Sequence, residues 1–440
     1  MIRELSLSNF RAFEEAHIEL SRINLLFGPN NSGKSALISA VNVIAQTLEG
    51  GDYSVPLHLD GTRVDLGTYR DVVFRNDSNR PVEIGMLLDM GNRRTGNDTI
   101  DFNAGFHYMR VRKAIIVNSF EMRGSIEDME FSAKASEGYP DCWIGGYIKG
   151  SGTKRQPFRI RATYRNFVPV PFPRKKDLKV KRKGYYELSP EFSVVHYAFQ
   201  HIREAFQNLE YLGPFRVYPS RTFHFTGAIP STVGTRGENA IRILADDYLK
   251  LGKRKGQIAE KVSNWMTRSG VAEQIRVVTI SSRHFEVILK HSLTGEEENL
   301  ADIGFGCGQV LPILVSGYAA EKGSIFMVEQ PELHLHPRAQ AELGSFFYDM
   351  YKNGIQSIIE THSEHLLLRL QYYVAKGLVK PSDVRIYYVY ADGRSKKPRK
   401  RIKEIRIDET GRFIDKWPEG FFPETLEEAR RVAKARSDRR

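Results

Sequence analysis

The chain has 440 residues, of which 41% are hydrophobic and 27% charged, a composition typical of a globular protein with a buried core. Its net charge of +12 favours polyanionic partners such as nucleic acid but says nothing about the fold. Two distant cysteines, Cys142 and Cys307, exclude an intrachain disulfide framework and a CxxC metal site, and they favour a reducing, cytoplasmic setting. No run of 18 apolar residues occurs and MIRELSLSNF has no apolar signal segment, so we expect no membrane span, no membrane partner and no signal peptide.

Residues 1–47 predict a strand, a turn, a strand, a loop and a helix. IRELSLSNF alternates between apolar and polar residues, as a half-buried strand does. HIELSRINLLFG ends in an apolar run, and SALISAVNVIAQTL has the period of a helix. The loop between these two segments is rich in Gly, Asn and Ser, which favours a tight turn of the backbone.

That loop, GPNNSGKS, matches the phosphate-binding pattern G-x-x-x-x-G-K-[ST], and its place between an apolar strand and a helix is the context that the pattern requires. We expect the backbone of this loop and the helix N-terminus to bind phosphates. The loop residues expected to contact the nucleotide are Gly28, Asn30, Asn31, Ser32 and Gly33. Lys34 should reach the β and γ phosphates and the Ser35 hydroxyl should bind Mg²⁺, so ATP and Mg²⁺ are the expected cofactors.

Residues 48–300 contain short strand-like runs separated by Gly, Pro and aromatic residues, followed by the helical stretch EFSVVHYAFQHIREAFQNL. The absence of a heptad pattern argues against a long coiled-coil arm. VPVPFPRKKDLKVKRKGYYEL combines prolines with a basic run and predicts an exposed loop. Two interpretations of this run stay open, a solvated basic face and a phosphate contact. The candidate contacts are Lys175, Lys176, Lys181, Arg182 and Lys183.

From residue 301 strands and helices alternate again. DIGFGCGQ predicts a glycine-rich loop before a helix that Pro312 interrupts; this loop is either a second anion-binding nest or a plain turn. SIFMVEQ predicts a buried strand, PRAQAELGSFFYDMYKNG an amphipathic helix, and QSIIETHSEHLLLRLQYYVAKG a strand, a turn and a helix. DVRIYYVYAD and RIKEIRIDETGRF predict a final pair of strands.

The segment SIFMVEQPELHLHP offers two interpretations. IFMV is apolar throughout, as a strand covered on both faces is, and Glu329 stands at its C-terminal end, where α/β sheets place ligand groups. Glu329 is therefore the candidate Mg²⁺ acid. His334 and His336 suggest a zinc site, but no Cys or Asp completes a tetrahedral set, so we favour the nucleotide interpretation. We expect His336 in a loop that crosses to a second subunit.

Two further residues have both a functional and a structural interpretation. His362, in THS directly after the strand QSIIE, can sense the γ phosphate; a surface histidine in a turn is the alternative. Cys307 is flanked by glycines, and no base lies near it in sequence to activate it, so we expect it to serve packing and not reactivity.

These elements, in this order, resemble the ABC-type ATPases of the SMC/RecF/OLD group. NFRAF and INLLFGPNNSGKSAL are similar to their N-terminal lobe, and DIGFGCGQVLPI to their signature loop. VEQPELHLHP is similar to their Walker B motif and D-loop, and ETHSEHLLLRL to their switch-histidine strand. WPEGFFPETLEEA resembles the C-terminal extension of a bacterial branch of stand-alone AAA-type ATPases without a TOPRIM domain. The clear similarity covers roughly residues 1–47 and 205–430.

The resemblance implies an α/β fold: an ABC/RecF-like P-loop head with a mixed sheet flanked by helices, and a strand-rich and helical insertion between Walker A and Walker B. It implies that Lys34 and Ser35 hold phosphate and Mg²⁺, that Glu329 is the Mg²⁺-site acid and that His362 is the switch histidine. It also adds to the nucleotide-binding set Arg11, Gly306, Gly308 and Gln309. The expected domains are an N-terminal lobe (1–90), an inserted basic lever region (91–235), a C-terminal lobe (236–390) and a C-terminal extension (391–440).

Three positions depart from the family pattern. The Mg²⁺ acid is Glu in place of Asp, Gly308 stands where Ser is common, and Gln330 occupies the place of the Glu that activates water. An amide cannot accept a proton, so Gln330 can orient water but cannot act as a base. Glu332, the nearest carboxylate, is the candidate base, and a slowly hydrolysing switch is the alternative.

We therefore expect an ATPase that forms a homodimer or higher homo-oligomer around ATP and couples nucleotide state to DNA or to an effector, in phage defence or genome maintenance. The alternatives are a nucleotide-gated scaffold that holds a separately encoded nuclease or toxin inactive, and a RecF-like DNA repair ATPase. We expect no intrinsic nuclease, because only about 80 residues follow His362 and because the acids there form no DxD pair. Those acids are Asp408, Glu409 and Asp415.

Overall fold

The structure is a computed structural model that describes residues 1–91, 98–126, 128–135, 140–172, 178–180, 186–225, 227–250, 256–291, 294–392 and 399–418. Several predictions fall on residues outside these ranges. They are the basic residues Lys175, Lys176, Lys181, Arg182 and Lys183 and the part of the C-terminal extension after Pro418. None of the described helices is both long and apolar enough to cross a membrane.

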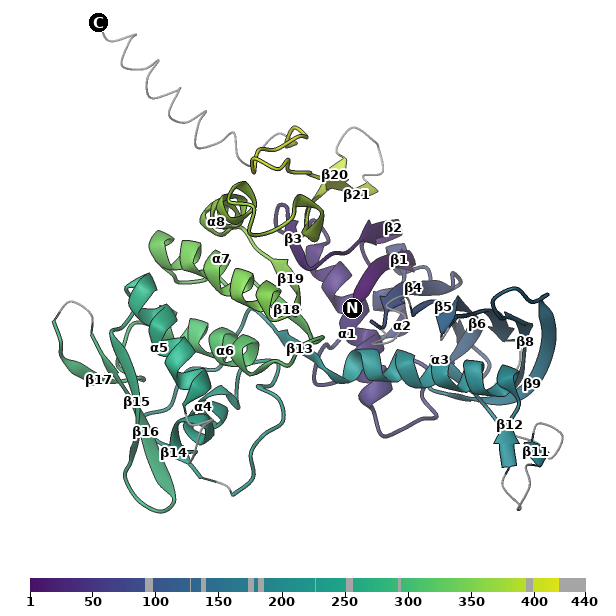
Figure 1. Ribbon diagram of the computed structural model, residues 1–440, viewed down its shortest axis with the longest axis horizontal. Coiled ribbons are helices and arrows are strands. Elements are labelled where there is room, and N and C mark those ends of the chain that lie inside the picture. Colours follow the sequence, from purple (N-terminus) through teal and green to yellow (C-terminus); the bar gives the residue numbers. More distant parts are fainter. Residues whose placement is uncertain are drawn as a thin grey trace, which may run out of the picture.

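A nine-stranded antiparallel sheet forms one side of the molecule (Figure 1), with the strand order β10-β9-β8-β7-β6-β5-β4-β1-β2. Its strands are β1 (Ile2–Phe10), β2 (Phe13–Glu19), β4 (Val82–Asp89), β5 (Thr99–Met109), β6 (Ala114–Ile126), β7 (Met129–Ala135), β8 (Asp141–Lys149), β9 (Gln156–Arg165) and β10 (Val168–Pro171). The half-buried strand predicted for residues 2–10 is confirmed, but a register shift between Ile2 and Glu4 interrupts the strict alternation. Because β4 pairs with both β1 and β5, one sheet continues across the predicted domain boundary at residue 90, and the four-domain division stays a prediction.

A six-stranded sheet lies in the middle of the molecule, with the order β13-β18-β19-β3-β20-β21. Its strands are β3 (Ile23–Phe27), β13 (Leu209–Leu212), β18 (Ile325–Glu329), β19 (Gln356–Glu360), β20 (Val384–Asp392) and β21 (Arg399–Glu404). All neighbours are parallel except β20 and β21, which form the predicted final antiparallel pair. The fold is thus mixed α/β with sheets flanked by helices, as the sequence predicted.

Helices cover both faces of the six-stranded sheet and the core face of the nine-stranded sheet. They are α1 (Lys34–Glu49), α2 (Tyr69–Val72), α3 (Pro190–Gln207), α4 (Ala240–Leu249), α5 (Gln257–Ser269), α6 (Phe305–Ala319), α7 (Pro337–Lys352) and α8 (Glu364–Ala375), with the 3₁₀ turns η1 (Phe74–Asn76) and η3 (Pro381–Asp383). A small sheet of β14 (Phe223–His224), β15 (Gln274–Thr279), β16 (His284–Lys290) and β17 (Glu297–Asn299) lies beside α4 and α5, and β11 (Leu178–Val180) pairs with β12 (Tyr186–Leu188).

The six-stranded sheet separates two hydrophobic cores. Along β18, Ile325 and Met327 belong to the core shared with α1, α3 and the nine-stranded sheet. Phe326 and Val328 point the other way, into the core formed with α4 to α8. This confirms that IFMV is covered on both faces, and it explains why the strand is apolar at every position.

The glycine-rich segment DIGFGCGQ is not the loop that the sequence predicted. Helix α6 already begins at Phe305, so Gly306, Gly308 and Gln309 lie in its first turns, and the helix continues past Pro312 to Ala319. Packing overrides the loop propensity here: a side chain on Gly308 would contact the ring of Pro219, and Pro312 packs against Gly237. The predicted second anion-binding nest is therefore wrong as a loop structure; a helix N-terminus takes its place.

One buried amide joins the two large sheets. The side chain of Gln356, at the start of β19, accepts a hydrogen bond from the Ile2 backbone N–H at 2.9 Å. It donates to the carbonyl oxygens of Ile2 at 2.6 Å and Ser21 at 2.7 Å. These three bonds fix the first strand of the nine-stranded sheet to the strand that carries Glu360.

We expect Gln356→Leu to lower the free energy of unfolding by on the order of 3 kcal/mol, because it leaves several buried backbone groups without partners. The matched control is Gln371→Leu on α8, where the side chain makes a single bond to the Gly411 carbonyl oxygen, and we expect about 1 kcal/mol there. Urea unfolding of both variants measures the difference. Equal losses would contradict a special role for Gln356.

Candidate nucleotide-binding site

The phosphate-binding loop lies between the end of β3 and the start of α1, and two of its glycines are required by geometry. Gly28 and Gly33 have φ angles of 144° and 111°, which disfavour any residue with a side chain. A side chain on Gly28 would also collide with the Val389 carbonyl group of β20, and one on Gly33 would approach the Phe13 ring to 3.0 Å. The Lys34 ammonium donates to the Gly28 and Pro29 carbonyl oxygens at 2.8 and 3.0 Å.

Two glutamates end the neighbouring parallel strands β18 and β19. Glu329 and Glu360 are register partners, and Glu360 is also paired with Leu26 of β3, just before the loop. Glu360 accepts a hydrogen bond from the Ser35 hydroxyl at 2.9 Å and lies 3.7 Å from the Lys34 ammonium. The sequence analysis missed Glu360, although the rule that selected Glu329, an acid at the end of a buried strand, applies equally to QSIIE.

The environment of Glu329 favours its protonated form. Burial, reinforced by the charge of Glu360, raises the pKa of Glu329 to about 7, and this outweighs the hydrogen bond that the Tyr211 hydroxyl donates at 2.6 Å. Burial also lowers the pKa of Lys34, while Glu360 opposes that shift. The carboxyl oxygens of Glu329 and Glu360 and the Ser35 hydroxyl are the hard oxygen ligands that Mg²⁺ prefers, so this set fits the ion.

A buried arginine holds the end of β18. Arg216 follows β13, is 6% exposed, and donates from Nη2 to the Glu329 carbonyl oxygen at 2.6 Å. Its Nε and Nη1 have no hydrogen-bond partner among the described residues. Burial lowers the pKa of Arg216 to about 10, against the opposing charges of Glu332 and Glu329. Its own carbonyl oxygen accepts a long bond of 3.5 Å from the Gln309 side chain on α6. Neither Arg216 nor Tyr211 was singled out from the sequence.

Gln330 and Glu332 differ in what they face. Gln330 has a left-handed backbone with φ 45°, donates from its N–H to the Glu360 carbonyl oxygen at 2.7 Å, and lines the phosphate cavity. Glu332 is buried, and its carboxylate accepts bonds from the Thr361 hydroxyl at 2.8 Å and the His362 N–H at 2.6 Å. Glu332 thus holds the segment after β19 in place, and its predicted role as base stays a prediction.

His362 keeps a neutral imidazole near neutral pH. Burial and the nearby charge of Lys34 both lower its pKa. Its Nε2 is buried and has no hydrogen-bond partner among the described residues. A neutral ring beside the phosphate loop can donate a hydrogen bond to a phosphate oxygen without adding charge.

A cavity of about 710 Å³ opens in front of the loop, a volume suited to a nucleotide. Among the predicted residues it is lined by Arg11, Asn30, Asn31, Ser32, Gly33, Lys34, Ser35 and Gln330. The residues that the sequence analysis missed are Ala12, Ala36, Asp71, Val73, Arg75, Asn76 and Glu360. Arg11 and Arg75, both with left-handed backbones, add positive charge to the cavity lining.

The predicted signature residues do not line the phosphate cavity. Gly306 lines a groove of about 500 Å³ with Gly304, Phe305, His334 and His336, and no described residue of this groove also lines the phosphate cavity. Gly308 and Gln309 are buried. His336 caps α7 by accepting a bond from the Arg338 N–H at 3.3 Å, and no described group of three or more His, Cys, Asp or Glu side chains is arranged for a metal.

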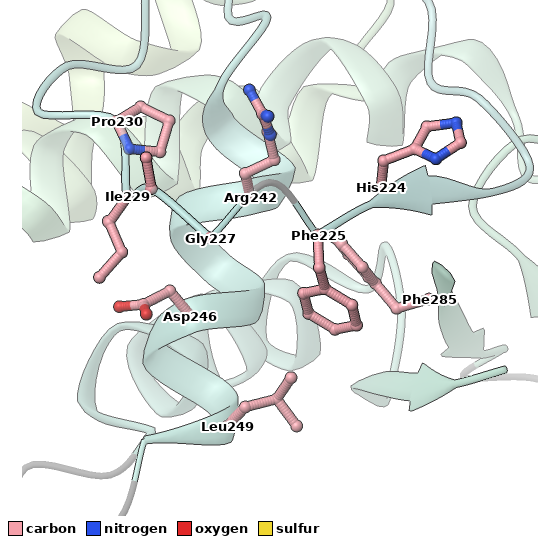
Figure 2. Close-up of a pocket in the computed structure, with 10 residues that line it drawn as sticks. His224, Phe225, Gly227, Ile229, Pro230, Arg242, Asp246, Leu249 and Phe285 are labelled. Carbon is pink, nitrogen blue, oxygen red and sulfur yellow. The ribbon is translucent and has the colours of Figure 1, made fainter. Parts of the chain in front are cut away.

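A further cavity of about 280 Å³ lies beside the small sheet, far along the chain from the phosphate loop (Figure 2). Figure 2 shows Phe225 and Phe285 on one side of it and Leu249 of α4 below. Its lining is largely apolar and brings no set of nucleophilic or metal-binding groups together, so we assign no chemistry to it.

The loop geometry, the cavity and the paired acids define a P-loop nucleotide-binding protein of the mixed α/β class. Residues 23–369 match the family described as "AAA domain, putative AbiEii toxin, Type IV TA system", and the chain belongs to this AAA domain family. Residues 379–431 match a second family, described as a protein of unknown function (DUF3696). No curated protein matches the chain.

Three solved structures with some similarity are heads of SMC proteins. The SmcHead bound to the C-winged helix domain of ScpA is 11% identical, with 92% of this chain and 98% of that chain covered and a TM-score of 0.48. The SMC head domain from Thermotoga maritima is 10% identical, with 92% and 99% covered and a TM-score of 0.36. The Smc head domain with an extended coiled coil bound to ScpA, from Pyrococcus furiosus, is 11% identical, with 99% and 98% covered and a TM-score of 0.40. Similarity at this level assigns no activity.

Without Mg²⁺ and nucleotide, we expect Glu329→Gln to become more stable relative to the wild type as the pH rises. A carboxyl whose pKa is raised to about 7 in the folded state stabilises the fold below its unfolded pKa and loses that contribution as the pH rises through 7. The wild type should therefore lose on the order of 3 kcal/mol relative to the glutamine variant between about pH 4.5 and 8. Urea unfolding in EDTA measures this difference.

Glu210→Gln is the matched control for this prediction. Burial also raises the pKa of Glu210, on β13, to about 7, so a similar pH effect is expected there. Stabilisation by added MgATP should survive in Glu210→Gln and fall in Glu329→Gln. If the free energies of unfolding of wild type and Glu329→Gln instead change with pH in parallel, the pKa of Glu329 is not raised in the folded protein.

Proposed function

We propose that the chain is an ATPase of the ABC type, two copies of which close around ATP and pass the nucleotide state to DNA or an effector protein. The observation that carries this proposal is the contact between Ser35 of the P-loop and Glu360, beside Glu329 on the adjoining strand. This is the arrangement in which a hydroxyl and strand-end acids hold a divalent ion against the phosphates. Free, buried Cys142 and Cys307 suit the cytoplasmic setting that we propose.

We assign two roles to the residues at the cavity, the binding of phosphate and the positioning of water. When bound, Mg²⁺ would neutralise charge on the phosphates, and Ser35, Glu329 and Glu360 would hold it. The Lys34 ammonium, now bonded to loop carbonyl oxygens, is placed to turn toward the β and γ phosphates, with Arg11 and Arg75 nearby. The Gln330 amide lines the cavity and orients water. Because an amide accepts no proton, we propose slow hydrolysis that depends on positioning and charge stabilisation.

The separation between the phosphate cavity and α6 supports a two-copy arrangement. The described residues of the groove at Gly304, Phe305 and Gly306 do not line the phosphate cavity of their own chain, so this groove is available to a nucleotide held by another copy. Gly308 and Gln309 are buried, which leaves the first turn of α6 as the part that faces outward. We therefore propose a homodimer in which this turn closes on the sister nucleotide.

A second candidate function is a nucleotide-gated scaffold that holds a separately encoded toxin or nuclease inactive. Gln330, in place of a carboxylate at the cavity, favours it, because a slow ATPase stays in one state for long periods. The description of the matching family names a putative toxin of a toxin–antitoxin system, which supports a role in defence. A RecF-like role in DNA repair would use the same ATP site. It differs from the scaffold function in having nucleic acid as its partner.

We expect Lys34→Ala to abolish both ATP binding and ATP-dependent pairing, because it removes the cation that meets the phosphates. Phe305→Glu is the complementary variant: Phe305 is 47% exposed in the first turn of α6 and does not line the phosphate cavity. It should bind ATP with unchanged affinity and fail to pair. Sedimentation velocity with and without MgATP gives the assembly state. A Lys34→Ala protein that still pairs with ATP, or a Phe305→Glu protein that pairs like the wild type, would reject the arrangement.

We expect Gln330→Glu to raise single-turnover ATP hydrolysis on the order of 100-fold, because it supplies a base at the cavity. Glu332→Gln should keep the rate within about threefold, since an amide can still accept the His362 N–H bond and pair with the Thr361 hydroxyl. If Glu332→Gln instead abolishes hydrolysis while its midpoint of thermal unfolding is unchanged, Glu332 is the base and Gln330 takes no part in activating water.

A further inference from the structure

The nine-stranded sheet has an outward face near the end farthest from the small sheet, on β8 and β9 (Figure 1). On β8, Cys142, Ile144 and Ile148 are buried in the core, so Trp143, Gly145 and Tyr147 point to the opposite face. On β9, the buried residues are Ile160, Ala162 and Tyr164, so the outward residues are Arg159, Arg161, Thr163 and Arg165. Trp143 pairs with Arg161 and Gly145 with Arg159 in the ladder.

Aromatic rings and guanidinium groups are stacked on this face. The Arg159 guanidinium carbon lies 4.8 Å from the centre of the Trp143 ring. The Arg155 guanidinium carbon, just before β9, lies 4.4 Å from the centre of the Tyr147 ring. Trp143 and Tyr147 are four residues apart, about 13 Å along the strand, and Gly145 puts no side chain between them. The result is a strip with two ring–guanidinium pairs.

The balance between cationic and acidic side chains on the sheet changes at this strip. On the neighbouring strands, cations are matched by acids: Arg123 pairs with Asp101 at 2.8 Å, and Lys134 pairs with Glu121. On β8 and β9, the described residues give an ion-pair partner to Lys149 and Arg161 but none to Arg155.

Arg159 is likewise without an ion pair among the described residues, and Lys154 next to Arg155 is exposed. The positive charge that remains unmatched therefore gathers beside the two rings. The carboxylates of Asp141 and Glu130 lie at the margins of the strip and pair with Arg161 and Lys149.

We propose that this strip of β8 and β9 binds single-stranded nucleic acid. Bases would stack on the guanidinium planes of Arg159 and Arg155, which the rings of Trp143 and Tyr147 hold in place, and phosphates would meet the guanidinium edges and Lys154. This sheet face presents no helix or two-stranded ribbon to the major groove of a duplex, which argues for unpaired bases. An acidic protein segment would match the charge but would bring no flat rings for the two stacking positions.

The proposed function left the partner open, and this site would bind single-stranded nucleic acid. The inference rests on the proposed function only for the coupling of this binding to ATP. Binding is therefore tested without nucleotide, by fluorescence anisotropy of a labelled oligo-dT of roughly 20 nucleotides at about 50 and about 200 mM salt. Arg155→Gln with Arg159→Gln should raise the Kd about tenfold and flatten the salt dependence by roughly two phosphate contacts. Trp143→Leu should raise the Kd about tenfold, and Trp143→Phe less, because a ring remains.

Two controls keep a failure of this site distinct from a failure of the ATP site. Arg123→Gln removes a cation from the same sheet face, but one that is paired with Asp101, so its Kd should stay within about twofold of the wild type. Trp143→Leu should still bind ATP with the affinity of the wild type, because Trp143 does not line the phosphate cavity. Unchanged circular dichroism of every variant verifies folding.

The proposal is overturned if the wild type does not bind oligo-dT, or if Arg155→Gln with Arg159→Gln and Trp143→Leu bind it like the wild type. It is also overturned if a labelled polyglutamate binds where oligo-dT does not, because the strip would then serve an acidic protein. Equal affinity for a duplex of the same length, unaffected by Trp143→Leu, would overturn it as well, because stacking would then play no part.

Discussion

Two buried carboxyl groups at the ends of adjacent parallel strands are the constraint on which the nucleotide site depends. Strand register brings Glu329 and Glu360 together beside the P-loop, where burial and the charge of Glu360 disfavour ionisation of Glu329. The protein offsets this cost locally: Ser35 and Lys34 face Glu360, and Tyr211 donates to Glu329. A divalent cation resolves the same repulsion more completely than any of these contacts, so the cavity is electrostatically prepared for a metal-bound polyphosphate.

Contacts from several parts of the chain support this pair. Strand β13, more than a hundred residues before β18 in the chain, supplies Tyr211 and is followed by Arg216, which binds the last carbonyl group of β18. The carboxylate of Glu332 fixes the segment that carries His362. Because the Arg216 carbonyl oxygen also receives the Gln309 side chain, one arginine contacts both the strand that bears Glu329 and the first turns of α6.

Much of this site could be predicted from local sequence because its signals are local. The apolar run before Gly28, the glycine spacing and the helical period after Lys34 fix the P-loop, and the unbroken apolar strand before Glu329 marks a two-sided core. Glu360 was equally accessible by the same rule and was overlooked in favour of the histidine that follows it. Arg216 was not accessible, because its position depends on the parallel pairing of β13 with β18, which leaves no periodic pattern in so short a strand.

The extent of the nine-stranded sheet could not be predicted either, since short alternating runs do not reveal which neighbours they pair with. The glycines of DIGFGCGQ led to the wrong prediction of a loop at the start of α6. Close contact with Pro219 and with the backbone of His334 explains Gly308 and Gly306 better than loop formation does. In both cases long-range packing decided between local conformations that the sequence leaves equally open.

The continuous hydrogen bonding of the nine-stranded sheet has a mechanical consequence. The turn between β1 and β2 places Ala12 and Phe13 against Gly33 of the P-loop, while β10 lies at the opposite edge of the same sheet. Nine strands span about 38 Å at the usual spacing, so a tilt of about 5° at the β2 edge would carry the far edge by about 3 Å. A rearrangement of the triphosphate too small to disturb the core can thus become a displacement comparable to the spacing of stacked bases.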